Sequence, residues 1–160
     1  MRNDSVRLQE LQRLVILDSP REQAYDDITR SLASILDVPI AMVNLLDEDR
    51  DWFKSAVGLA MSESPVATSF CQALFKESDE LIIVEDTLKD LRFSSHPLVT
   101  GPPFIRFYAA ARLLVSEQLV GTLCAYDMHP KRLTEVQRDH LQRLGRAVID
   151  LFKARAAAGW

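Results

Sequence analysis

DTLKDLRFSSHPLVTGPPFIRFYAAARLLVSEQLVGTLCAYD, residues 86–127, holds the segments from which the architecture of the chain can be worked out. Its two apolar runs, 107–115 and 119–127, flank a short polar turn and predict an antiparallel hairpin. Before them lies a polar connector that bears Arg and His, with one helical turn capped by Asp86. A polar connector beside apolar strands is typical of the wall of a small-molecule pocket.

The rest of the chain supplies helices at both ends and further short strands between them. Expected elements are a helix capped by Asp4 or Ser5, a helix over 20–36 that opens with a capping box at Ser19, strands over 40–47 and 52–57, a short helix over 70–75, a strand over 81–84, and a helix from the Thr134 capping box to about 155. Residues 59–68 and 94–104 are expected to be irregular. Antiparallel hairpins between terminal helices indicate an α+β fold.

Three consecutive alanines, Ala109, Ala110 and Ala111, open the strand over 107–115. They indicate either close approach by a neighbouring element or room for a ligand. Leu141, Leu144, Val148 and Leu151 form an apolar seam on the last helix. That seam predicts either a dimer interface or the stripe that covers the sheet.

Length and composition limit the classes of protein to consider. The 160 residues fit one domain, 1–160, with a core over about 5–153. The net charge of −4 gives no reason to expect nucleic acid binding. No apolar run reaches the ~20 residues of a membrane span, and no signal peptide is expected. The two cysteines, Cys71 and Cys124, lie far apart, which favours the reducing cytoplasm over a disulfide scaffold or zinc site.

Several sequence blocks, in order, resemble bacterial GAF domains, which are small-molecule sensor modules of signalling proteins. The blocks are LDEDR at 46–50, WFKS at 52–55, SFC at 69–71, PLVTGPP at 97–103, IRFYA at 105–109 and GTLC at 121–124. The resemblance implies a central antiparallel sheet of about six strands, with the first and last helices packed on one face. It implies a ligand pocket on the other face, formed with the connectors 60–75 and 86–106. It also implies a homodimer through the terminal helices and relay of ligand binding to an output domain.

The chain departs from the specialised branches of this family. Ala73 stands where related domains commonly have histidine, and Gln72 follows Cys71 where bilin-binding members often have histidine. These departures argue against covalent bilin attachment. The signature of cyclic-nucleotide-binding members is not visible, and the two cysteines do not reproduce the set used by free methionine sulfoxide reductases.

Ten residues are the candidates for ligand binding: Trp52, Phe70, Cys71, Asp86, Arg92, Phe93, His96, Arg106, Tyr108 and Tyr126. The arginines suit capture of carboxylate or phosphate, or else they tie the connector to Asp86 and Asp90. Cys71 is either a reactive thiol at a helix start or a packed apolar residue. His96 is a ligand donor or a structural residue, and no metal site is expected from a single histidine without a spaced partner.

The sequence therefore favours a non-enzymatic sensory domain that binds a small, anionic or aromatic molecule. The first alternative is a dimerisation module with a degenerate pocket. The second is an enzyme acting through Cys71, which is disfavoured because no His or Asp lies at a spacing that would activate the thiol. The sequence identifies neither the ligand nor a cofactor.

Overall fold

A six-stranded antiparallel sheet forms the centre of the structure, a computed structural model that describes residues 1–158. The strands are β1 (Ile40–Leu46), β2 (Arg50–Val57), β3 (Glu63–Pro65), β4 (Leu81–Val84), β5 (Phe107–Val115) and β6 (Gln118–Asp127). Their order across the sheet is β3-β2-β1-β6-β5-β4, and every neighbouring pair is antiparallel. The predicted α+β class and both predicted hairpins are confirmed.

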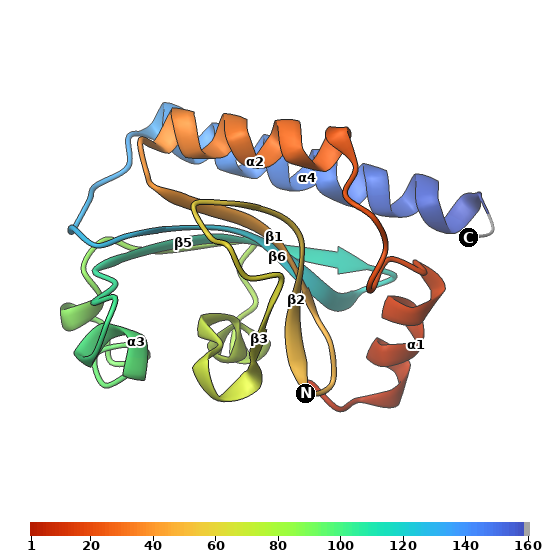
Figure 1. Cartoon of the computed structure of the whole chain (residues 1–160), viewed down its shortest axis with the longest axis horizontal. Coiled ribbons are helices and arrows are strands. Elements are labelled where there is room, and N and C mark those ends of the chain that lie inside the picture. The colour runs from red at the N-terminus through yellow and green to blue at the C-terminus, as the bar shows by residue number, and fades with distance from the viewer. Residues whose placement is uncertain (159–160) are drawn as a thin grey trace.

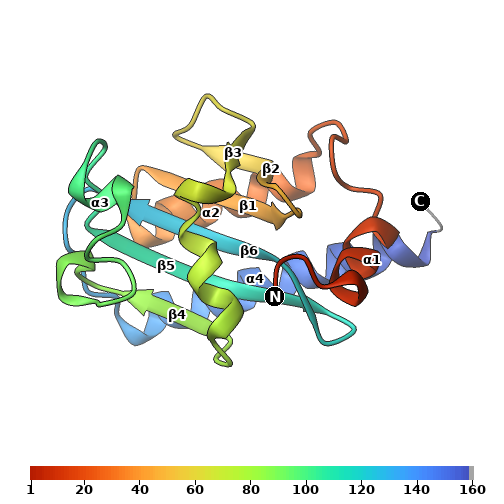
Figure 2. The same cartoon turned by 90° about the horizontal axis from the view of Figure 1, so that it is seen from below.

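Helices cover one face of this sheet, and short turns of helix cover the other. α2 (Gln23–Leu36) and α4 (Glu135–Ala157) lie side by side across one face, while α1 (Ser5–Arg13) lies at one end of the sheet, against β6 (Figure 1). The opposite face carries η1 (Val66–Thr68), η2 (Phe70–Lys76), η3 (Thr87–Lys89) and α3 (Pro97–Thr100) (Figure 2). No helix within residues 1–158 is long and apolar enough to cross a membrane.

The sheet separates two apolar cores. Side chains alternate along β5, so Phe107 and Ala109 belong to the core under the helices, while Tyr108 and Ala110 belong to the core under the short turns. A strand covered on both faces needs apolar residues at every position. This explains why 107–115 is apolar at every position except Arg112, without the alternation of a half-exposed strand.

The chain forms α2 differently from the prediction. The expected capping box at Ser19 does not form, and α2 begins at Gln23 without a side-chain cap. The Glu22 carboxylate instead pairs with Lys54 Nζ at 2.6 Å and Arg155 Nη1 at 2.8 Å, and the Ser19 hydroxyl donates to the Ile16 carbonyl. The sequence pattern assigned the Glu22 carboxylate to the cap of α2, but in the structure this carboxylate forms two tertiary ion pairs instead. The Thr134 capping box, which has no such competitor, is present as predicted.

Two segments that were expected to be irregular contain short regular elements. Residues 63–65 form β3 at the sheet edge, and 97–100 form α3, with the His96 side chain accepting the Leu98 N–H. The short helix expected over 70–75 is present as the 3-10 helix η2. α3 and η2 lie on the face of the sheet opposite α2 and α4 (Figure 2).

The seam on α4 covers the sheet. Leu141 and Val148 are fully buried in the core under the helices, and Leu144 and Leu151 pack against the same core. α4 approaches β5 closely at Gly145, where an added Cβ would lie 2.7 Å from the Ala111 Cβ. The small residues at this crossing therefore reflect close helix–sheet packing.

Replacing Gly145 with Ala is expected to destabilise the fold, although alanine is the better helix former by about 1 kcal/mol. The added methyl group overpacks a site occupied by Ala111 Cβ at 2.7 Å, which costs about 1–3 kcal/mol. Urea unfolding of Gly145→Ala measures the difference. The double variant with Ala111→Gly removes the obstructing methyl and should recover part of the loss. A Gly145→Ala protein more stable than wild type would contradict this packing.

Candidate functional site

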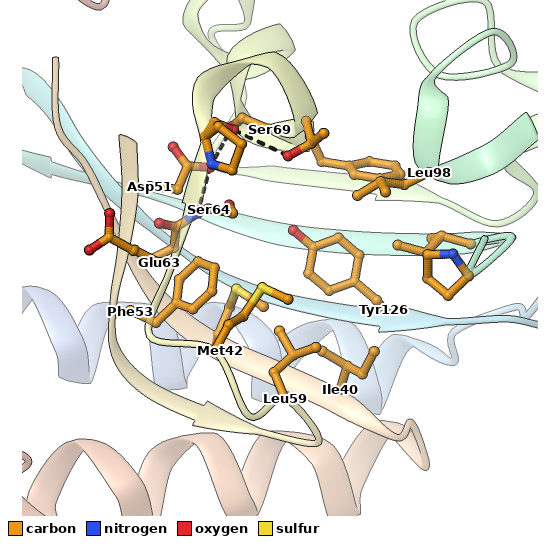
Figure 3. Close-up of a pocket in the computed structure, with 17 residues that line it drawn as sticks. Ile40, Met42, Asp51, Phe53, Leu59, Glu63, Ser64, Ser69, Leu98 and Tyr126 are labelled. Atoms are coloured by element: carbon orange, nitrogen blue, oxygen red, sulfur yellow. Dashed lines mark hydrogen bonds between the residues drawn. The ribbon is translucent and has the colours of Figure 1, made fainter. Parts of the chain in front are cut away.

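A cavity of about 460 Å³ lies between the sheet and the connectors on the face opposite α2 and α4 (Figure 3). Its walls come from β1, β2, β6 and the segments 59–70 and 98–105. The lining residues are Ile40, Met42, Asn44, Asp51, Phe53, Leu59, Met61, Glu63, Ser64, Pro65, Thr68, Ser69, Phe70, Leu98, Pro103, Ile105 and Tyr126. Most are apolar, and the polar members gather at one end, near Asp51, Ser64 and Ser69 (Figure 3).

Strand alternation decides which residues of β1 and β2 reach the cavity. Met42 and Asn44 are two apart on β1 and both line it, as do Asp51 and Phe53 on β2. Trp52 lies between them and points to the other face, where it belongs to the core under the helices. The expectation that Trp52 contributes to the pocket is therefore wrong, because the register of β2 places it on the opposite face of the sheet.

A buried carboxylate organises the polar end of the cavity. Ser69 Oγ donates to Asp51 Oδ2 at 2.5 Å, and Asn44 Nδ2 donates to the same oxygen at 3.2 Å. Arg2 Nη1 lies 2.9 Å from Asp51 Oδ1, and both side chains are almost completely buried. A buried charge is stable when it is paired and hydrogen-bonded. Asp51 therefore fixes the positions of Asn44 and Ser69 at the cavity wall.

The oxygen of the Asn44 side-chain amide has no hydrogen-bond partner in the described chain. Asp51 can only accept, so it holds the NH₂ group of Asn44 toward itself and turns the amide oxygen away. Asn44 Oδ1 is buried and accepts no hydrogen bond from any protein group in the described chain. An unsatisfied acceptor in a cavity wall is a place where a ligand can donate.

Behind the cavity wall lies a layer of thiols and hydroxyls. Cys71 Sγ lies 3.3 Å from Tyr108 Oη and 3.2 Å from Thr122 Oγ1, and Cys124 is next to Thr122 as well. Neither cysteine is exposed. Burial raises the pKa of Tyr108 and of Cys124 well above their ordinary values, so these groups stay protonated. The layer is closed off from the cavity and offers no accessible nucleophile.

An aromatic cluster centred on Phe70 supports the same wall. Its ring lies 5.1 Å from Phe93, 4.2 Å from His96, 5.2 Å from Tyr108 and 5.4 Å from Tyr126, centroid to centroid. Only Phe70 and Tyr126 of the cluster are among the cavity-lining residues. Phe93 and Tyr108 therefore support the site from behind.

The charged candidates of the connector lie outside the cavity, and each is paired with an oppositely charged side chain. Arg92 bridges Asp90 and Glu77, both at 2.7 Å, and Arg106 pairs with Asp86 at 3.1 Å. These contacts match the alternative in which the arginines tie down the connector.

His96 also has a structural contact. Its Nδ1 accepts the Leu98 N–H at 3.0 Å, and burial lowers the pKa of the ring. A neutral imidazole with Nδ1 as acceptor caps α3. Within residues 1–158, no three His, Cys, Asp or Glu side chains come together in a way that would hold a metal ion.

Sequence reasoning missed the polar residues that define the cavity, Asn44, Asp51 and Ser69. Asn44 could have been recognised from the sequence, because it is the single polar residue in the otherwise apolar segment 40–46. A polar side chain in a strand covered on both faces needs a partner. The partner Asp51 belongs to the next strand of the same hairpin.

Replacing Arg2 with Ala is expected to destabilise the protein by about 3–5 kcal/mol, because it leaves the buried Asp51 carboxylate without its cation. Arg92→Ala is the matched control, since it removes an exposed arginine and should change stability by less than about 1 kcal/mol. Urea unfolding measures the free energy of unfolding of both variants and of wild type. Equal effects would contradict the assignment of Arg2 as the partner of a buried charge.

Comparisons with known proteins agree with this architecture. The sequence model of the GAF domain family matches residues 20–149. A cyclic di-GMP phosphodiesterase of Pseudomonas aeruginosa is 34% identical over 119 residues, which are 74% of this chain and 20% of that protein. The chain thus spans about a fifth of that relative.

Solved structures share the fold at low sequence identity. The GAF domain of an Acinetobacter phosphoenolpyruvate-protein phosphotransferase has a TM-score of 0.70 at 18% identity, with 98% of both chains covered. Free methionine-R-sulfoxide reductase of Neisseria meningitidis has a TM-score of 0.63 at 16% identity, with 93% of this chain and 89% of that chain covered. A domain of a putative sensor histidine kinase of Sinorhizobium meliloti has a TM-score of 0.63 at 17% identity, with 86% of this chain and 94% of that chain covered. By the family match over 20–149, this chain belongs to the GAF domain family.

Proposed function

We propose that this chain is a non-enzymatic sensory GAF domain that binds a small molecule in the cavity beside β1, β2 and β6. The observation that carries the proposal is the cavity itself. Its volume of about 460 Å³ falls within the range of small-molecule sites, and its lining is mostly apolar with a few polar groups at one end. The proposed domain spans 1–160, although residues 159–160 lie outside the described part of the chain.

The lining changes the expected character of the ligand. An anionic ligand was expected from Arg92 and Arg106, but both arginines are paired outside the cavity. No arginine or lysine is found among the lining residues of the described chain, which include the carboxylates of Asp51 and Glu63. The aromatic part of the expectation is retained, since Phe53, Phe70 and Tyr126 line the walls. The proposed ligand is therefore a mostly apolar or aromatic molecule without a negative charge.

The proposed output is a signalling domain elsewhere in the same protein or complex. The Pseudomonas relative is a cyclic di-GMP phosphodiesterase of which this chain covers 20%, and one structural neighbour is a putative sensor histidine kinase domain. A role in bacterial signal transduction in the cytoplasm fits these relatives and the two free cysteines. The burial of Cys71 supports a non-enzymatic role over a thiol-dependent one.

A relay to the terminal helices has a physical route in this fold. Asp51 at the cavity wall pairs with Arg2, and the Arg2 carbonyl accepts from Arg7 of α1 at 2.6 Å and 3.0 Å. Arg155 of α4 in turn donates to the Leu14 carbonyl just after α1, at 2.7 Å. A shift of Asp51 on ligand binding would therefore reach both terminal helices through paired groups.

Filling the cavity is expected to abolish ligand binding. Met42→Trp places a larger side chain in the cavity, whereas Leu91→Trp adds the same side chain at a position 96% exposed. Native mass spectrometry of freshly purified protein detects a retained molecule. Saturation-transfer NMR with neutral aromatic fragments (indole, benzimidazole and quinoline) measures binding of added ones. We expect wild type, Leu91→Trp and Arg106→Ala to bind at least one fragment and Met42→Trp to lose that binding at least tenfold.

An outcome without binding favours the alternative function. If wild type retains no molecule and binds no fragment, the cavity is degenerate and the domain is a dimerisation or interaction module. If Met42→Trp binds as well as Leu91→Trp, a ligand is bound elsewhere. Circular dichroism on each variant confirms that the fold is retained before binding is compared.

We also propose a homodimer through the terminal helices. The α4 seam is used against the sheet, so the contact would use other surfaces, and Val6 of α1 and Val15 just after it are about half exposed. Arg155 of α4 donates to the Val15 carbonyl at 2.8 Å, which places Val15 near the end of α4. Light scattering after size exclusion should give twice the chain mass for wild type and a shift toward monomer for Val6→Glu. A monomeric wild type at about 100 μM contradicts this dimer.

A further inference from the structure

The polar end of the cavity has a specific pattern of donors and acceptors. We propose that the ligand is a neutral, largely apolar ring system with an N–H group, and that Asn44 Oδ1 accepts the hydrogen bond from that group. This inference rests on the proposed function of the cavity and names the chemical class of its ligand. It follows from which polar atoms at this end of the cavity already have hydrogen-bond partners within the protein.

Most donors at the polar end are already used. Ser69 Oγ and Asn44 Nδ2 both donate to Asp51 Oδ2, at 2.5 Å and 3.2 Å. Thr68 Oγ1 donates to the Pro65 carbonyl at 3.2 Å. Both of the hydrogen bonds to Asp51 go to Oδ2, while Asp51 Oδ1 accepts no hydrogen bond and is balanced by the Arg2 ion pair. The hydroxyl groups of Tyr126 and Ser64 still have a proton to offer.

Two acceptors at this end accept no hydrogen bond in the described chain, Asp51 Oδ1 and Asn44 Oδ1, and only Asp51 Oδ1 has a cation beside it, Arg2 at 2.9 Å. Asn44 is 1% exposed, and no protein group in the described chain donates to its Oδ1. The oxygen has almost no accessible surface in the empty cavity, so the unpaired acceptor is a cost that the folded protein already carries. A buried polar group of this kind discriminates strongly against ligands that cannot pair with it. A ligand whose N–H reaches this oxygen supplies the missing hydrogen bond.

The charges of the residues that line the cavity restrict the class of ligand further. The charge of Asp51 is balanced by Arg2 at 2.9 Å, and that of Glu63 at the cavity mouth is balanced by Arg50 at 3.2 Å. No lining residue within 1–158 supplies a free cation for a carboxylate or phosphate. No lining carboxylate is left unpaired for an ammonium group either. A neutral ligand fits this balance, because burying an unpaired charge is unfavourable.

The shape of the remaining wall favours a ring. Phe53 and Tyr126 lie with Met42, Leu59 and Ile40 around the cavity, and the Tyr126 hydroxyl points toward the polar end (Figure 3). Aromatic and thioether side chains make favourable contacts with ring faces and edges. The Tyr126 hydroxyl can donate to a carbonyl or ring nitrogen on the same ligand.

The test compares matched compounds that differ in the donor. Indole carries the N–H, 1-methylindole lacks it, and 2-methylindole carries both the N–H and an added methyl group as a control for size. Indole-3-acetate adds a negative charge. Titration calorimetry or NMR titration gives the affinity of each for wild type and for Asn44→Leu, which removes the acceptor while keeping an apolar side chain of similar volume. The wild-type comparison needs no variant, so it stands even if Asn44→Leu folds poorly.

We expect wild type to bind indole and 2-methylindole roughly 3- to 10-fold more tightly than 1-methylindole, and indole-3-acetate more weakly than indole. In Asn44→Leu the ratio of indole to 1-methylindole affinity should fall to about 1. Equal wild-type affinities for indole and 1-methylindole would overturn the assignment of Asn44 while leaving the cavity as a binding site. Tighter binding of indole-3-acetate would overturn the neutral class. Binding of none of the compounds would overturn this inference and the proposed function together.

Discussion

The buried carboxylate of Asp51 is the constraint on which the site depends. It is 2% exposed, so its charge must be matched inside the protein. Arg2, Ser69 and Asn44 supply the matching groups from three segments far apart in sequence. Satisfying one charge therefore brings together the N-terminal segment, the junction of η1 and η2 at Ser69, and β1. The polar end of the cavity is the place where those segments meet, and its geometry is fixed before any ligand arrives.

Alternate side chains of the strands point to opposite faces of the sheet, so one set packs under the helices and the other set faces the cavity. On β1, Val43 and Leu45 enter the core under α2 and α4, while Met42 and Asn44 line the cavity. The helix side can then be packed tightly, as at the contact of Gly145 with Ala111 on β5, without filling the other face. Because both faces of the central strands are covered, most positions of β1, β5 and β6 are apolar, and the buried polar side chains of Asn44 and Thr122 have buried partners.

This explains why the fold was predictable from the sequence and the site much less so. Apolar runs, the Thr134 capping box and short turns identify elements locally, and they predicted both hairpins and the long last helix. The candidate site residues were chosen by side-chain chemistry, which favoured Arg92 and Arg106. Their carboxylate partners lie close by on the protein surface, and pairing of this kind is not visible from residue type alone. Trp52 points to the helix-covered face, whereas its neighbours Asp51 and Phe53 point to the cavity. The sequence alone does not show which of two alternating sets of side chains faces the cavity.

The pocket and its proposed relay share one set of contacts. Asn44, whose unpaired oxygen is the acceptor proposed for the ligand, is held by the same carboxylate that holds Arg2. Arg2 accepts hydrogen bonds from Arg7 of α1, so three successive contacts (Asn44–Asp51, Asp51–Arg2 and Arg2–Arg7) join Asn44 to the first helix. Buried ionic groups resist small displacements, since any mismatch leaves a charge without its partner. For a sensor of the proposed kind, this stiffness makes the network suited to carrying a change from the cavity toward the terminal helices.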